Sequence, residues 1–159
     1  MAEVLLITPL SGPTPLPELS LLSHRVSVLS PSEQVLTASA ESDVVVVDSR
    51  SDLVGAKTIC QMFATTGVIV PRLLVVAERG LSVVTTEWGV SDFIVDGAGP
   101  AEYEARIRLL TTAAAAAPET ISGGGIVIDE GAYSVSPHDR QLDLTYKEFE
   151  LLKYLVQHP

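Results

Sequence analysis

The stretch Asp43-Val44-Val45-Val46-Val47-Asp48 decides how this chain folds. Four consecutive valines favour a strand, and an apolar run of this length is typical of a central parallel strand that is buried on both faces. The carboxylate of Asp48 closes the run. In open α/β sheets the functional crevice lies outside the carboxyl ends of the strands. The sequence therefore predicts that Asp48 lies at the functional edge of such a sheet.

The segments around this run alternate between strand-like and helix-like patterns. The predicted strands cover residues 3–8, 25–29, 43–48, 71–77 and 92–96. The first predicted helix starts near residue 18, and the other four cover residues 30–40, 52–63, 81–88 and 100–116. Alternation of this kind implies a parallel sheet with helices on both faces. The predicted fold class is therefore α/β, a flavodoxin-like (βα)5 domain with a five-stranded parallel sheet.

The pattern changes after residue 116. Residues 117–125 end in Ser-Gly-Gly-Gly, and their composition is that of a linker. Short strand-like segments follow at residues 126–129, 132–136 and 141–144. Thr145 and Glu148 have the spacing of a capping box before an amphipathic helix. We expect one domain over 1–116, a linker over 117–125, and over 126–159 the first part of a second domain that is truncated at Pro159.

Composition and charge exclude several classes of protein. The chain has 159 residues, of which 47% are hydrophobic and 19% charged, as in folded globular proteins. No apolar run approaches the roughly 18 to 20 residues of a membrane span, and no signal peptide is visible, so we expect a cytoplasmic protein without membrane contact. The single cysteine, Cys60, excludes an intramolecular disulfide. The formal net charge of −10 would repel a phosphate backbone, so this chain should not bind DNA by itself.

No catalytic or metal-binding pattern is present in the sequence. The three histidines are scattered without metal-ligand spacing, and no glycine-rich turn joins the first strand to the first helix. We therefore expect no cofactor, no metal and no catalytic residue, and the chain is not predicted to be an enzyme.

Two motifs resemble one family. Residues 99–108 (GPAEYEARIR) resemble the final receiver helix of OmpR-type response regulators. Residues 142–152 (LDLTYKEFELL) resemble the start of their winged-helix effector domain. The run from Ile126 to Pro159 is most similar to the GlnR branch of that family, the atypical orphan regulators of nitrogen metabolism in actinobacteria. The resemblance implies a transcription regulator that binds promoters as a dimer, here with the DNA-binding part missing beyond Pro159.

The chain departs from the family pattern at the positions that support phosphorylation. Thr8-Pro9-Leu10 stands where a receiver has the acidic pair that holds Mg²⁺. Val76 and Ala77 stand where it has a Ser or Thr, and Asp96 stands where it has a Lys. Phosphoryl transfer depends on positioning and charge stabilisation, so loss of these groups argues against phosphorylation of Asp48.

Two interpretations of Asp48 remain open from the sequence. It is either a phosphoacceptor or a strand-end carboxylate that pairs with a nearby cation. For the second interpretation the candidate partners are Arg50, two residues later, and Thr8, at the end of the neighbouring first strand. We expect bonds from both residues to hold the domain in its dimer-competent form without phosphate.

The resemblance also implies a symmetric dimer through the face formed by helix 81–88, strand 92–96 and helix 100–116. The residues of this chain at the matching positions are Asp92, Glu102, Arg106 and Arg108, and the candidates for apolar contact on this face are Val83, Val84 and Trp88. We expect Asp92 to pair with Arg106 of a second copy, although a solvated helix face would show the same charges. Phe93 stands where the family has an aromatic residue that changes rotamer on activation, and we expect it to be buried.

Three functions remain. The first is a nitrogen-metabolism transcription regulator that forms homodimers without phosphorylation. The second is a conventional regulator switched by phosphorylation of Asp48. The third is a small α/β enzyme, which would need a cofactor loop or an activated nucleophile that the sequence does not show.

Overall fold

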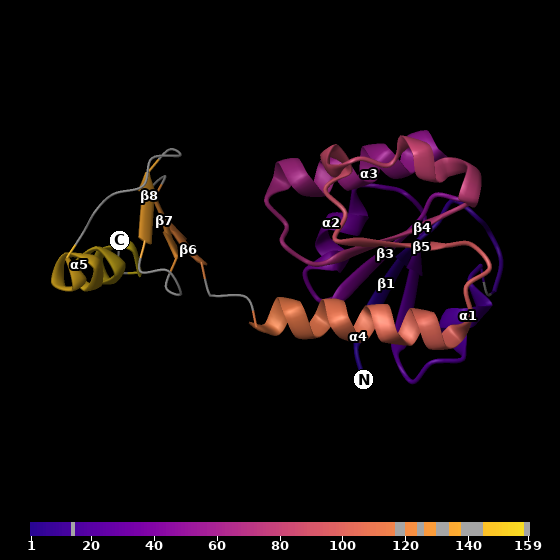
Figure 1. Ribbon diagram of the computed structural model, residues 1–159, viewed down its shortest axis with the longest axis horizontal. Helices are drawn as coiled ribbons and strands as arrows, with labels where there is room; N and C mark the ends of the chain where they lie inside the picture. The colour runs from indigo at the N-terminus through magenta and orange to yellow at the C-terminus, as the bar shows by residue number, and fades with distance from the viewer. Residues whose placement is uncertain (14, 117–119, 124–125, 130–133, 138–144, 158–159) are drawn as a thin grey trace. The chain divides into compact units, whose positions relative to one another are not determined.

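The computed structural model describes residues 1–13, 15–116, 120–123, 126–129, 134–137 and 145–157 (Figure 1). The chain divides into two compact units, Met1–Ala115 and Ala116–Pro159, and each is described by itself. None of the described helices is long and apolar enough to cross a lipid bilayer.

The first unit is built on a parallel sheet. Its strands are β1 (Glu3–Ile7), β2 (Arg25–Leu29), β3 (Val44–Asp48), β4 (Arg72–Val76) and β5 (Asp92–Val95). Their order in the sheet is β2-β1-β3-β4-β5, and each neighbouring pair is parallel. Every residue of β3 is buried, as a central strand requires. The predicted flavodoxin-like α/β fold is confirmed.

Helices cover both faces of this sheet. They are α1 (Pro17–Ser20), α2 (Gln34–Ser39), α3 (Leu53–Thr66), the 3₁₀ helices η1 (Glu78–Val83) and η2 (Thr86–Trp88), and α4 (Pro100–Ala116). Helices α2 and α3 lie on one face, and α1 and α4 lie on the other (Figure 1). The predicted helix 100–116 matches α4, whereas the helix predicted near residue 18 has only four residues.

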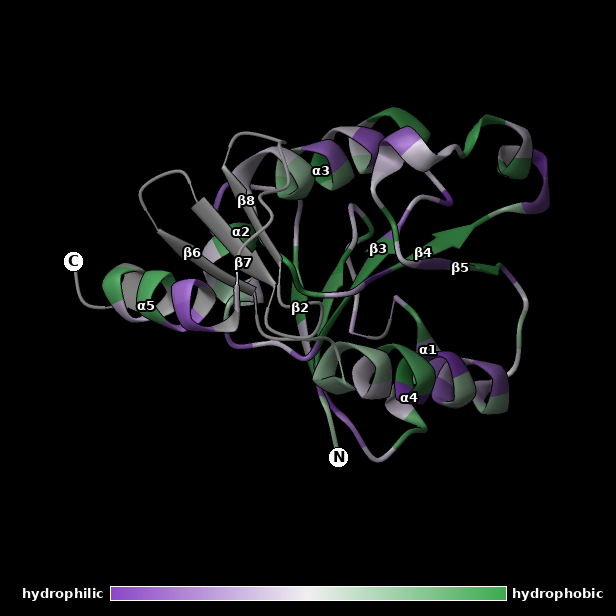
Figure 2. Ribbon diagram, turned by 60° about the vertical axis from the view of Figure 1, so that its left-hand side comes forward, coloured by the Kyte–Doolittle hydropathy of each residue, from purple (hydrophilic) through white to green (hydrophobic). Residues whose placement is uncertain are grey.

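The core consists of two apolar layers, because successive strand side chains point to opposite faces. Leu5, Val45 and Leu74 pack with α2 and α3, and Val46 and Leu73 pack with α1 and α4. Figure 2 shows the resulting run of apolar residues along β3 and β4. Cys60 lies in the layer beneath α2 and α3, where burial raises the pKa of its thiol to about 11. The thiol is therefore protonated at neutral pH.

The ends of α3 follow from two local signals. Asp52 is the N-cap, and its carboxylate accepts a hydrogen bond from the amide of Gly55 at 2.8 Å. Gly67 ends the helix with a φ of 72°, a left-handed conformation that glycine adopts without strain. The helix therefore continues past the predicted end at Phe63 to Thr66.

The single helix predicted over residues 81–88 is wrong. Two 3₁₀ helices take its place, and between them Val84 and Thr85 have extended backbone angles. The run Val83-Val84-Thr85-Thr86 is entirely β-branched, and such residues lose side-chain freedom in an α-helix. Gly89, with a φ of 68°, then ends η2. Local preference therefore breaks this segment into two turns.

The second unit contains an antiparallel meander and one helix. Its strands are β6 (Thr120–Gly123), β7 (Ile126–Asp129) and β8 (Ser134–Pro137), in the order β6-β7-β8, and its helix is α5 (Tyr146–Gln157). Residues 120–123 fall in the segment that composition predicted to be a linker, but they pair with β7. The predicted strand at 141–144 lies outside the described residues.

Before α5, one of the two hydrogen bonds of the predicted capping box is present. The Glu148 carboxylate accepts hydrogen bonds from the amide and the hydroxyl of Thr145, at 2.8 and 2.7 Å. These bonds lower the pKa of Glu148. The threonine hydroxyl thus donates to the glutamate side chain at the start of the helix.

Removing a core side chain tests this packing. Leu74 is fully buried in β4, and Leu74→Ala should lower the free energy of unfolding by roughly 2–5 kcal/mol through lost burial and a residual cavity. Leu21→Ala is the matched control, because Leu21 is 73% exposed and should change stability by no more than about 0.5 kcal/mol. Urea denaturation measures both. Equal losses for the two variants would contradict the assignment of the core.

Candidate functional site

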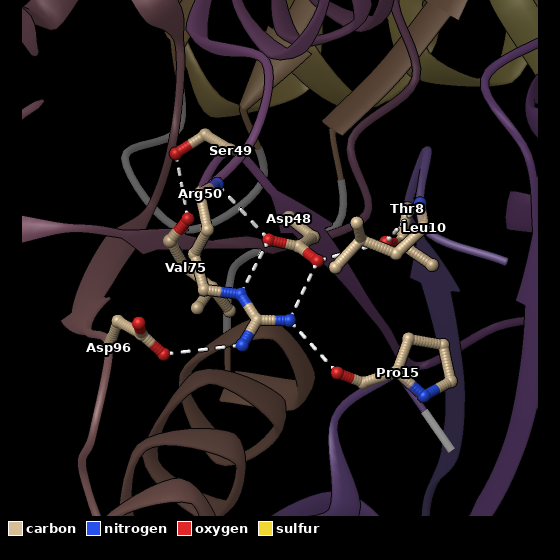
Figure 3. Close-up of polar contacts among 8 residues, drawn as sticks. All are labelled: Thr8, Leu10, Pro15, Asp48, Ser49, Arg50, Val75 and Asp96. Carbon is tan, nitrogen blue, oxygen red and sulfur yellow. Dashed lines mark hydrogen bonds and ion pairs between the residues drawn. The ribbon is translucent and has the colours of Figure 1, made fainter. Parts of the chain in front are cut away.

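The candidate site lies at the carboxyl ends of the parallel strands. Asp48 is the last residue of β3, Thr8 follows β1, and Asp96 follows β5. Arg50 belongs to the loop between β3 and α3. In Figure 3 Thr8 and Arg50 converge on the carboxylate of Asp48, whose side chain has 0% exposure, and Asp96 contacts Arg50.

Thr8 and Asp48 are joined by a short hydrogen bond. The Thr8 hydroxyl donates to Oδ2 of Asp48 at 2.8 Å and accepts from the amide of Leu10 at 3.1 Å (Figure 3). Because the amide is a donor only, the hydroxyl proton must point toward the carboxylate. The backbone after β1 therefore fixes the direction of this bond.

Arg50 holds the same carboxylate through two parallel bonds. Nε donates to Oδ1 of Asp48 at 2.9 Å, and Nη2 donates to Oδ2 at 3.0 Å. The backbone amide of Arg50 adds a bond to Oδ1 at 3.1 Å. A guanidinium matches a carboxylate in this two-point geometry, and charge-assisted bonds of this kind are stronger than neutral ones. Both oxygens of Asp48 are thus engaged by donors.

The remaining bonds of Arg50 reach two further loops. Nη1 donates to Oδ1 of Asp96 at 3.2 Å, and Nη2 donates to the carbonyl oxygen of Pro15 at 2.9 Å. The Arg50 side chain is only 19% exposed. One arginine therefore ties together the segments that follow β3 and β5 and the loop that precedes α1.

The electrostatics of the site favour two charged partners. Burial acts to raise the pKa of Asp48, but the hydrogen bonds from Arg50 and Thr8 outweigh it and hold this pKa below its usual value. The pKa of Arg50 is raised, mainly by its hydrogen bond to Asp48. At neutral pH the pair is therefore an ion pair that is sheltered from solvent.

The residues present do not fit the Mg²⁺ ion that receiver domains use. Mg²⁺ requires several oxygen ligands in near-octahedral geometry. Both oxygens of Asp48 accept bonds from protein donors, and Thr8-Pro9-Leu10 brings no carboxylate. Among the described residues, no group of three or more His, Cys, Asp or Glu is placed to hold a metal.

The other predicted switch positions differ in their environment. Val76 is fully buried at the end of β4, Ala77 follows it, and neither carries a hydroxyl. Asp96 accepts a bond from Arg50, so it belongs to the same network. The sequence interpretation treated Asp96 only as a charge that would repel phosphate. The sequence signal for this pairing was the opposite charge of Arg50 and Asp96, which both follow the carboxyl ends of strands in one sheet.

Ser49 is a further site residue that the sequence did not suggest. It is 1% exposed, and its hydroxyl donates to the carbonyl oxygen of Val75 at 2.7 Å (Figure 3). The amide of Ser49 donates to the same oxygen at 2.9 Å. These bonds continue the β3–β4 pairing past Asp48 and fix the start of the loop that carries Arg50.

Two residues of the expected dimer face lie where the sequence did not place them. Trp88 is 2% exposed, and its Nε1 donates to the carbonyl oxygen of Val83 at 3.1 Å, so its placement as an interface residue is wrong. The turn η2 directs this side chain into the layer that contains α3. Phe93 is 43% exposed, because β5 is an edge strand, so the expectation that it is buried is also wrong.

The charged residues of that face pair within one chain. Arg106 donates to Oδ2 of Asp92 at 2.9 Å and to Oε1 of Glu102 at 2.8 Å. The sequence had placed the Asp92 contact between two copies. Arg108 is exposed on α4 and has no ion pair within the described part of the chain. Pairing of any of these residues across copies remains a prediction.

The buried ion pair can be tested by removing its cation. Arg50→Met should lower the free energy of unfolding at neutral pH by about 3–5 kcal/mol, since it leaves the Asp48 carboxylate buried without a counter-charge. In that background Asp48→Asn should cost much less than it does in the wild type. A double-mutant cycle by urea denaturation measures the coupling. Additive single losses would show that the two side chains are not energetically linked.

The lowered pKa of Asp48 predicts a pH dependence of stability. Its contribution is fully present above the unfolded-state value of about 3.9 and is lost as the pH falls through the lower folded-state value. The stability advantage of the wild type over Asp48→Asn should therefore shrink in acid. Glu33→Gln, a change at an exposed carboxyl, is the control and should follow the wild type. A difference that stays constant with pH would contradict the assignment.

Comparison with known proteins places the chain in a family. A family model described as the N-terminal domain of the transcription regulator GlnR matches residues 2–111. The chain is 29% identical over 136 residues to the alkaline phosphatase synthesis transcriptional regulatory protein SphR of Synechococcus elongatus. It is 29% identical over 137 residues to the DNA-binding response regulator MtrA of Mycolicibacterium smegmatis. These matches cover 82% and 84% of this chain but only 53% and 60% of those proteins.

Solved structures share the fold at low sequence identity. The response regulator DrrB of Thermotoga maritima, an OmpR/PhoB homologue, matches with a TM-score of 0.54 and 20% identity over 99% of this chain and 73% of its own. A response regulator receiver domain protein from Clostridium thermocellum matches with a TM-score of 0.61 and 15% identity over 72% of this chain and 98% of its own. The family model covers most of the residues of the present chain. The chain therefore belongs to the family of the GlnR N-terminal domain.

Proposed function

We propose that this chain is the receiver-like part of a transcription regulator of nitrogen metabolism, and that it forms a homodimer without phosphorylation. The observation that carries the proposal is the bidentate pair of Arg50 with Asp48. This pair neutralises the carboxylate of Asp48 and occupies both of its oxygens without phosphate. The loops at the end of the sheet would therefore be held in one state by the protein's own side chains.

The dimer would form through the face that contains η1, β5 and α4. Phe93, Leu109 and Val83 are large apolar residues that are more than 40% exposed on these elements. Val83 was already a candidate from the sequence, and Phe93 and Leu109 would supply the apolar contact that the buried Trp88 does not. Exposed ion pairs contribute only about 0.2–1 kcal/mol each, so Arg106 and Arg108 would mainly fix the orientation of the two copies.

DNA contact would belong to a winged-helix domain of which the second unit forms the start, and not to the receiver-like unit. The formal net charge of the chain is −10, which opposes binding to a phosphate backbone. The relatives include a protein described as a DNA-binding response regulator. The capped helix α5 and the β6-β7-β8 meander would begin a winged-helix domain, whose recognition helix would enter the major groove.

An enzymatic role is not supported. The family and the relatives are described as transcriptional regulators. The polar residues at the end of the sheet bond one another in a closed network, which leaves no activated nucleophile beside a free base. The proposal therefore places the chain among regulators.

Sedimentation equilibrium of this chain with and without Mg²⁺ and acetyl phosphate tests the proposal. We expect a dimer at micromolar concentration that does not respond to either addition, because Arg50 already neutralises Asp48. Intact-mass spectrometry after the treatment should show no added phosphoryl group. A monomer that dimerises only after treatment, with one phosphoryl group added, would instead support a regulator switched at Asp48.

Charge reversal on α4 tests the interface. Arg108→Glu should weaken the dimer without loss of stability, because Arg108 has no ion pair among the described residues. Arg106→Glu should weaken it too, but it also breaks bonds within the chain to Asp92 and Glu102. Glu33→Lys is the charge-reversal control and should leave the dimer intact, because Glu33 is exposed just before α2, away from η1, β5 and α4. A dimer unaffected by both arginine changes would exclude this face.

A further inference from the structure

A second surface for self-association lies at the opposite edge of the sheet. The strand order places β2 at one end and β5 at the other, as Figure 2 shows. On its inner side β2 pairs with β1 over all five residues, from Arg25 to Leu29. On its outer side no described strand pairs with it.

The backbone bonds of β2 show which groups face outward. The amide of Arg25 donates to the carbonyl oxygen of Ala2, and the carbonyl oxygen of Leu29 accepts from the amide of Thr8, both at 3.0 Å. The polar backbone groups of a strand alternate in direction from one residue to the next. Those of Val26 and Val28 therefore point away from the sheet, where they meet no partner in the described part of the chain.

The helices on either side leave this strand poorly covered. Helix α1 has four residues and α2 has six, and Val28 is 46% exposed. A hollow of about 140 Å³ lies beside Val26 and Val28 on the α1 face, with Leu16, Leu19 and Pro15 in its wall. A larger hollow of about 440 Å³ lies on the α2 face beside Ser27. An added strand could therefore approach the edge without displacing a helix.

The edge also lacks the features by which proteins prevent strand pairing. Natural edge strands carry a lysine, a proline, a bulge or an inward-pointing charge. The sequence of β2 is Arg-Val-Ser-Val-Leu, and its register with β1 is continuous. Its one charge, Arg25, stands at the first position and is paired with Glu3 at 2.8 Å. None of these features lies at Val26 or Val28.

We propose that β2 pairs in antiparallel fashion with β2 of a second copy of this chain, about a two-fold axis at Ser27. In this register Val26 lies opposite Val28 of the other copy, and Val28 lies opposite its Val26. Each of these is a hydrogen-bonded pair, since the outward groups of Val26 and Val28 are the ones that meet. The two sheets join into one, and the valine side chains form cross-strand contacts on the α1 face.

A second copy fits this edge because the strand is complementary to itself. Its two outward-facing residues are identical and symmetric about Ser27, as a two-fold interface requires. Arg25 of one copy lies opposite Leu29 of the other. The two Arg25 residues are therefore separated by four strand positions, roughly 13 Å, which exceeds the screening length of about 8 Å at physiological salt.

This surface is independent of the dimer proposed above. It uses the outer edge of β2, whereas that dimer uses η1, the opposite edge strand β5, and the solvent-facing side of α4. If both form, dimers join into larger assemblies at higher protein concentration. The chain has a net charge of −10, so β2 pairing should strengthen as added salt screens the repulsion between copies.

Hydrogen exchange of single amides tests the pairing directly. In Arg108→Glu, which is expected to weaken the other dimer, the amides of Val26 and Val28 should become protected as the protein concentration rises. The amide of Arg25 is an internal reference, because its bond to Ala2 protects it at every concentration. Exchange at Val26 and Val28 that stays fast and independent of concentration would overturn the proposal, and a strand of a different protein would then be the occupant to seek.

A matched pair of substitutions completes the test. In the Arg108→Glu background, Val28→Lys should weaken self-association at least tenfold by sedimentation equilibrium, since each lysine would replace the apolar partner of Val26 in the other copy and the two lysines would lie on the same face of the joined sheet. Val28→Thr keeps a β-branched side chain and should change it less than threefold. Val28 is half-exposed, so both variants should fold, and thermal unfolding checks this. Equal affinities in Val28→Lys and Val28→Thr would overturn the proposal, whatever the Arg108→Glu variant shows about the other face.

Discussion

The structure of the first unit depends on the buried ion pair between Asp48 and Arg50. A carboxylate with no exposure at the end of a buried strand has lost its hydration, and an unpaired charge there would cost several kcal/mol. Four hydrogen bonds, three from Arg50 and one from Thr8, replace that hydration. The carboxylate in turn fixes the conformations of the loops after β1 and β3. Strand β3 consists of four valines and Asp48, and it tolerates the charge at its end because both carboxylate oxygens accept hydrogen bonds.

This arrangement changes what the end of the sheet can do. In a phosphorylation switch the loops need two states that differ in charge at the acceptor aspartate. Here the guanidinium of Arg50 supplies positive charge at all times and also bonds Asp96, the residue that stands in the place of the receiver lysine. A phosphoryl group would have to displace these bonds and would meet a second carboxylate. In the proposed function, the residues that oppose phosphorylation are therefore the same ones that hold the loops in a single state.

The sequence predicted the parts of this site that depend on nearby residues and on strand order. The run 43–48 identified the central strand, and the parallel topology brought Thr8 to Asp48 although 40 positions separate them. The positions of Trp88 and Phe93 were not predictable in this way. Each depends on where an irregular segment turns and on which strand ends the sheet. Residues 81–88 gave a weak helical pattern, and the β-branched run within it was the stronger signal for two short turns.

The bond from Arg50 to Pro15 links the closed site to the open edge of the sheet. The loop before α1 is rich in proline, and Arg50 holds it by the carbonyl oxygen of Pro15. Helix α1, which follows this loop, has only four residues, and it covers less of β2 than a longer helix would. The wall of the hollow next to Val26 and Val28 includes Pro15 itself. Arg50, which bonds both oxygens of Asp48, thus also bonds the loop that forms part of this hollow beside the edge strand.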